Sequence, residues 1–89
     1  MSPNAEERIE RVVSVPLWLL RAYLEDLGGQ PDGDARVVGK GWEARLTQAE
    51  DYRIGSLRVG RVRLELLGKA DALAQLLPPL ELKLLRGGG

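Results

Sequence analysis

Hydrophobic and polar residues follow two different periods along this 89-residue chain. Between residues 14 and 29 leucines recur every three or four positions, a spacing that places Leu17, Leu20, Leu24 and Leu27 on one helical face. Ser14 is expected to cap the start, Pro16 suits the first turn, and Gly28 suits the left-handed residue after the end. The pattern predicts one strong amphipathic helix.

Alternation with a period of two predicts β-strands on both sides of that helix. The segments expected in strands are residues 8–15, 35–38, 42–47, 52–59 and 61–67. A hairpin turn at residues 39–41, a polar connection at residues 48–51 and a turn at Gly60 separate the later strands. Gly55 is expected to hold a bulge, because the apolar phase shifts there.

The C-terminal part predicts a second, shorter helix over residues 69–77. Its inward positions are Ala70, Leu73, Leu76 and Leu77. Two prolines at 78 and 79 are expected to end it, and residues 80–86 alternate like a last strand or form a loosely packed extension. The order β-α-β-β-β-β-α predicts a single-domain α+β fold, an antiparallel sheet with two helices on one face, spanning residues 8–86 between a flexible arm (1–7) and a flexible tail (87–89).

The composition of the chain excludes several kinds of functional site but does not by itself indicate a function. Thirteen basic and 13 acidic residues balance, and cysteine and histidine are absent, which excludes disulfides, thiolate chemistry, imidazole catalysis and the common zinc sites. No acidic pair or phosphate-binding glycine motif stands out, so we expect a non-enzymatic protein without metal or cofactor. No apolar run resembles a signal peptide or spans a bilayer, which predicts a cytoplasmic protein, and the arginine-rich composition is compatible with a thermophilic source.

Two surface features are candidates for binding. Trp18 and Leu19 fall outside the leucine stripe, so either a loop or the N-terminal arm covers them or they form a partner surface. The outward sheet positions Arg45, Arg58, Arg61 and Arg63 form either a basic patch for phosphate or an acidic protein, or a solvated face neutralised by Glu43 and Glu65. No stacking aromatics interleave with these arginines, which argues against nucleic acid.

The chain closes with Gly87, Gly88 and Gly89, and this run is the third candidate. Glycines can thread a narrow channel and present a terminal carboxylate to an activating enzyme, as in ubiquitin-like sulfur carriers. A plain flexible end is the more frequent explanation of such a run.

Three segments together resemble the C-terminal domain of MoaD-related proteins. They are the Trp-Leu-Leu-x-x-Tyr-Leu-Glu-x-x-Gly-Gly segment at 18–29, Gly55-Ser56-Leu57 with Arg61-Val62-Arg63-Leu64-Glu65, and the closing Arg86-Gly87-Gly88-Gly89. MoaD is the small, sulfur-carrying subunit of molybdopterin synthase. The resemblance implies a TATA-binding-protein-like fold of β-α-β4-α order. A β-grasp carrier domain precedes this domain in fused relatives and is absent from this sequence, so we expect that the carrier role does not transfer with it.

The resemblance therefore implies a stand-alone accessory domain linked to molybdenum cofactor biosynthesis or related sulfur transfer. Its implied partners are a MoaD-like carrier, molybdopterin synthase or an E1-like activating enzyme, and a homodimer is left open. The alternatives are a sulfur carrier or protein modifier that uses the glycine tail, a small-ligand binder between helix and sheet, and nucleic-acid binding on the sheet.

Overall fold

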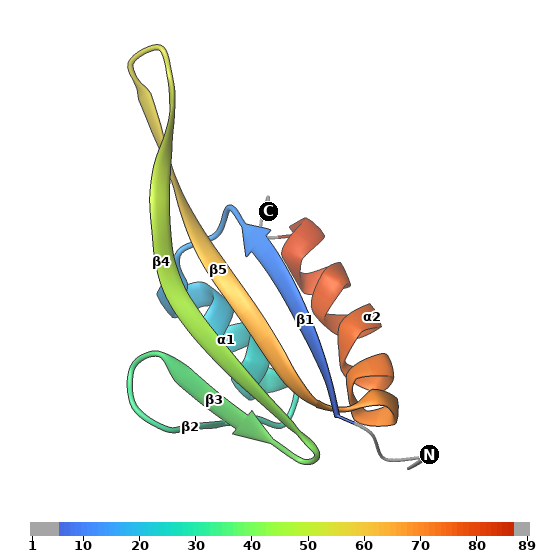
Figure 1. Cartoon of the computed structure of the whole chain (residues 1–89). Coiled ribbons are helices and arrows are strands. Elements are labelled where there is room, and N and C mark those ends of the chain that lie inside the picture. The colour runs from blue at the N-terminus through green and yellow to red at the C-terminus, as the bar shows by residue number, and fades with distance from the viewer. Residues whose placement is uncertain (1–5, 87–89) are drawn as a thin grey trace.

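One antiparallel sheet of five strands and two helices make up the protein (Figure 1). The computed structural model describes residues 6–86, except for the side chains of residues 50–54 and 57–59. The elements are β1 (Glu6–Val13), α1 (Leu17–Asp26), β2 (Gln30–Pro31), β3 (Arg36–Gly39), β4 (Trp42–Ile54), β5 (Leu57–Lys69) and α2 (Ala70–Arg86). The strands lie in the order β1-β5-β4-β3-β2. The predicted α+β class with an antiparallel sheet is confirmed.

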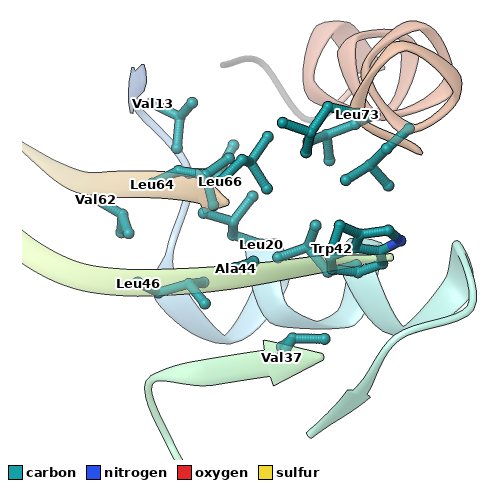
Figure 2. Close-up of a cluster of buried hydrophobic side chains, with 14 residues drawn as sticks. Val13, Leu20, Val37, Trp42, Ala44, Leu46, Val62, Leu64, Leu66 and Leu73 are labelled. Carbon is teal, nitrogen blue, oxygen red and sulfur yellow. The ribbon is translucent and has the colours of Figure 1, made fainter. Parts of the chain in front are cut away.

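The core lies between one face of the sheet and both helices. Alternate residues of the two central strands are buried, namely Trp42, Ala44 and Leu46 of β4 and Val62, Leu64 and Leu66 of β5. These side chains gather with Leu20 of α1 and Leu73 of α2 in a single cluster (Figure 2). Alternation in the strands therefore leaves the opposite sheet face to solvent.

The prediction for α1 is confirmed in its apolar face and its end. Leu20 and Leu24 are fully buried, and Gly28 has a φ of 103° just after the helix. The prediction that Ser14 caps the helix is wrong. The N-cap residue is Pro16, whose carbonyl accepts hydrogen bonds from the N–H groups of Leu19 (3.1 Å) and Leu20 (3.0 Å), without a side-chain cap.

Strands β4 and β5 are longer than predicted. Each runs for 13 residues without the expected connection at residues 48–51 or turn at Gly60. The turn between them lies at residues 55–56, and the register shift lies between Ala49 and Tyr52 rather than at Gly55. Backbone pairing thus continues where the apolar alternation is lost. The outer part of this hairpin, residues 49–61, extends beyond β1 and β3 (Figure 1).

Helix α2 runs through both prolines to Arg86, so the predicted helix end at residue 77 and strand at 80–86 are wrong. Leu73, Leu76 and Leu80 are buried at helical spacing, and this packing favours the helix over the local proline signal. The carbonyls that lose their donors belong to residues 74 and 75, which are exposed to water.

The strands after α1 cover other residues than the predicted strands, although the elements read β-α-β-β-β-β-α in both cases. The three strands expected at residues 42–47, 52–59 and 61–67 are two long strands, and β2 forms where a turn was expected. β1 begins at Glu6, inside the expected flexible arm. The TATA-binding-protein-like description stays a prediction.

Candidate interaction surface

The exposed side chain of Trp18 marks the first candidate surface. It is 64% exposed, although it lies between core-facing residues of α1. The surface hollow beside it, called the Trp18 surface below, is lined by Ser14, Val15, Pro16, Leu17, Trp18, Gln48 and Gly60. It therefore joins the β1–α1 connection to the base of the β4–β5 hairpin.

Local structure on both sides positions this hollow. Pro16 begins α1, which places Trp18 in the first turn on the flank away from the buried Leu20. Across the hollow, the side-chain amide of Gln48 donates a hydrogen bond to the carbonyl of Arg61 at 3.0 Å, so it is held on the hairpin. Gly60 has no side chain to fill the space.

The two residues predicted together at this flank have different environments. Leu19 is partly buried and packs against the core, whereas Trp18 stands free of it. The expectation that both lie well outside the packed face is therefore corrected for Leu19. Helical periodicity alone identified Trp18, but nothing in the sequence indicated Gln48 or Gly60, because their position depends on the long hairpin.

The arginines of the open sheet face lie among carboxylates. Arg45 donates to Glu43 (Nε–Oε2 2.9 Å) and lies 3.8 Å from Glu65. Arg36 makes two hydrogen bonds to the same Glu43 carboxylate, each 3.0 Å long, and one to Asp32 at 2.6 Å. The hydrogen bonds from Arg36, followed by those from Arg45, lower the pKa of Glu43, and Glu43 in turn raises the pKa of Arg36.

This network continues to the edge of the sheet. Arg8 forms ion pairs with Glu10 (2.6 Å) and with Glu65. Opposite charges thus alternate across β1, β5, β4 and β3. Of the predicted arginines, Arg45 belongs to this chain of charges through Glu43 and Glu65.

The other predicted arginines lie elsewhere on the hairpin. Arg63 is exposed opposite Thr47 and Val12 and forms no ion pair with another described residue. Arg61 is half-buried, and the side chain of Arg58 lies outside the described part of the structure. For Arg45, neutralisation by Glu43 and Glu65 matches one of the two predicted alternatives. The binding role of the arginines stays a prediction.

The space between helix and sheet is occupied by side chains. Leu20 and Leu24 have no exposure, and they belong to the same cluster as Val37, Leu46 and Leu64. A small-ligand pocket under these two leucines is therefore contradicted. Among the side chains of residues 6–49, 55–56 and 60–86, no group of three or more acidic, histidine or cysteine residues is placed to hold a metal ion. The tail at residues 87–89 lies outside the described residues.

These features define a small α+β protein with an exposed aromatic surface and an ion-paired open sheet face. The sequence profile of the family described as archaeal MoaD-like protein matches residues 8–89. The chain belongs to this family, which confirms the resemblance to MoaD-related proteins. No curated protein matches the chain. Neither helix of residues 6–86 is long and apolar enough to cross a membrane.

Proposed function

We propose that the protein is a non-enzymatic interaction domain in sulfur-carrier chemistry linked to molybdenum cofactor biosynthesis. Its Trp18 surface docks a MoaD-like carrier or a protein that works with one, such as molybdopterin synthase or an E1-like activating enzyme. The membership in the archaeal MoaD-like family supports the pathway. The exposure of Trp18 is the observation that supports the docking surface.

Trp18 suits this role because its ring is accessible without any change in the core. Tryptophan is enriched at the centres of protein interfaces, where a rigid ring removes a large apolar area from water. The adjoining hollow offers a partner side chain a place beside the ring, and the amide of Gln48 and the hydroxyl of Ser14 supply polar atoms at its rim. The open sheet face offers less, because Arg36, Arg45, Glu43 and Glu65 already pair with one another there.

The test is a binding titration with purified MoaD-like carrier, molybdopterin synthase and E1-like enzyme. Trp18→Ala is expected to weaken the association about tenfold or more, as for a central interface residue. Leu82→Ala is the matched control, because Leu82 is 60% exposed and lies on α2. Both variants should unfold at nearly the wild-type temperature, since neither side chain is in the core.

Two results would reject this assignment. One is binding that is unchanged by Trp18→Ala, which would move the contact elsewhere. The other is the lack of any association with all three proteins at low salt, where electrostatic attraction is strongest.

A second function rests on the family match, which extends through the glycine tail to residue 89. In this function the Gly89 carboxylate attacks the α-phosphate of ATP, which releases pyrophosphate and leaves an acyl adenylate. A sulfide donor then displaces AMP, and the product is a thiocarboxylate. Incubation with E1-like enzyme, ATP and a sulfide donor should replace one oxygen by sulfur in the intact mass. An unchanged mass, with a known carrier converted in parallel, rejects this function.

A further inference from the structure

The free edge of β1 is a second surface, independent of the Trp18 surface. β1 ends the sheet order, and within residues 6–86 it pairs only with β5. Its other edge therefore presents the backbone N–H and C=O groups of an eight-residue strand. At the opposite end of the sheet, β2 has two residues, one of which is Pro31, so it offers no comparable edge.

We propose that two copies of this chain pair antiparallel through β1, with Ile9 opposite Ile9 of the second copy, in a symmetric dimer with one continuous sheet. A two-fold axis between antiparallel strands keeps each sheet face on the same side in both copies, and directly opposed residues share a face. Odd-numbered residues of β1 must therefore oppose odd-numbered ones. Only pairings in which the two-fold axis passes beside a residue, so that this residue lies opposite its own copy, meet this condition.

Charge selects Ile9 as the centre. In that pairing Glu7 opposes Arg11 and Arg8 opposes Glu10, and symmetry makes each pair occur twice. If the axis passed beside any of these four charged residues instead, that residue would lie opposite the same residue of the second copy, which carries the same charge. Centres nearer the strand ends pair too few residues. Opposite charges across an antiparallel pair stabilise it and like charges destabilise it, so β1 is complementary to itself in this one register.

Apart from Glu81, which pairs with Arg11, the flank of α2 beside this edge is apolar. The ion pair between Arg11 and Glu81 (Nη2–Oε1 3.9 Å) identifies the side of α2 that faces the edge. Counting about 100° per residue, the same side carries Ala70, Ala74, Leu77, Pro78 and Leu85. Leu85 is 72% exposed, more than Trp18. Across the described part of the chain, no side chain covers most of Leu85.

The geometry of the dimer brings these flanks together. In one copy, α2 runs alongside β1 (Figure 1) and contacts both β1 and β5. Strands spaced about 4.8 Å apart therefore place the two α2 axes of the dimer about 10 Å apart. From Glu6 to Ile9 the strand advances about 10 Å, which equals about seven residues of helix from Ala70. The two-fold axis therefore passes near Leu77, and the small alanines of one helix face the Leu85 end of the other.

The dimer is first tested by light scattering and sedimentation of the wild-type protein across a concentration series. Leu85→Glu is expected to raise the dimer dissociation constant about tenfold or more, because it buries a charge near Glu6 and Glu7 of the second copy. Leu82→Glu is the matched control, since residue 82 lies on the solvent side of the same helix. A monomer at every concentration, or equal effects of the two variants, would overturn the proposal.

The register is tested by single cysteines, because the chain has none. Ile9→Cys places two thiols on directly opposed residues, whose Cα atoms lie about 5 Å apart, a distance that suits a disulfide. Val12→Cys is the control, because its two copies would lie about 20 Å apart along the strands. Under mild oxidation Ile9→Cys should form covalent dimers and Val12→Cys should not. Cross-linking at Val12 that is as fast as at Ile9 would reject the register.

Discussion

The close approach of Gly39 to Trp42 gives the sharpest stability prediction. The two residues lie directly opposite in the β3–β4 pairing. A methyl group on Gly39 would overlap the Cε2, Cζ2 and Nε1 atoms of the indole ring. Trp42 is 8% exposed, and the Cη2 atom of its ring lies so close to Gly29 that an added Cβ there would also collide with it. Gly39→Ala therefore forces the ring out of a tightly enclosed space.

The expected cost follows from two opposing contributions. Overpacking a filled core costs about 1–3 kcal/mol, and here the crowded atoms belong to a rigid ring. Replacing glycine by alanine also reduces the entropy of the unfolded chain, which recovers about 0.4–1 kcal/mol. The net effect is a loss of about 1–2 kcal/mol in the free energy of unfolding. In a domain of this size each kcal/mol lowers Tm by about 4–8 °C.

Urea unfolding followed by circular dichroism measures this loss, and a double-mutant cycle assigns it to the ring. Trp42→Leu removes the overlapping atoms, so Gly39→Ala should cost less in that background, with a coupling energy of about 1 kcal/mol or more. Equal costs in the two backgrounds would show that the ring is not the cause. A Gly39→Ala protein as stable as wild type would refute the packing argument altogether.

Three further predictions concern stability. The pKa of Glu43 lies below its ordinary value of 4.5, because Glu43 pairs with Arg36 and Arg45. This pairing therefore contributes stability that is fully present above about pH 4.5 and is lost as the pH falls through the lowered pKa. The destabilisation by Glu43→Gln in urea should therefore shrink in acid, and a constant difference would contradict the pairing. Pro78→Ala restores a backbone N–H donor at an exposed position of α2 and should raise the free energy of unfolding by about 2 kcal/mol. An unchanged Tm would mean that the helix tolerates the proline without strain. Leu24→Ala opens the fully buried core and should cost about 2–5 kcal/mol, and a smaller loss by the same measurement would indicate that the core can collapse.

The sequence predicted those parts of the fold in which local signals and packing agree. For α1, the leucine spacing and Gly28 point to the same helix, and the structure has it at residues 17–26. In α2 the signals conflict: two prolines indicate an end, but Leu80 continues the apolar stripe and is buried against the sheet. A local rule cannot weigh a proline against packing that forms only in the tertiary structure.

The long hairpin was missed for a related reason. Residues 48–51 are polar and break the alternation, yet β4 continues through them because β5 supplies backbone partners on the other side. Part of the candidate site was missed with it. Periodicity placed Trp18 off the core, but Gln48 and Gly60 reach the same hollow only when both strands run unbroken past the end of β1.

The distribution of charge explains why the Trp18 surface suits a protein partner better than the open sheet face. A partner on the sheet would have to remove water from Arg36, Arg45 and Glu43, which already pair with one another, so desolvation would offset most of the gain. Trp18 is 64% exposed, so its ring can be covered without uncovering a charge, and burial of an indole area of about 150 Å² corresponds to about 4 kcal/mol. Salt should therefore weaken docking at Trp18 little, while a contact through the arginines would weaken steeply with ionic strength.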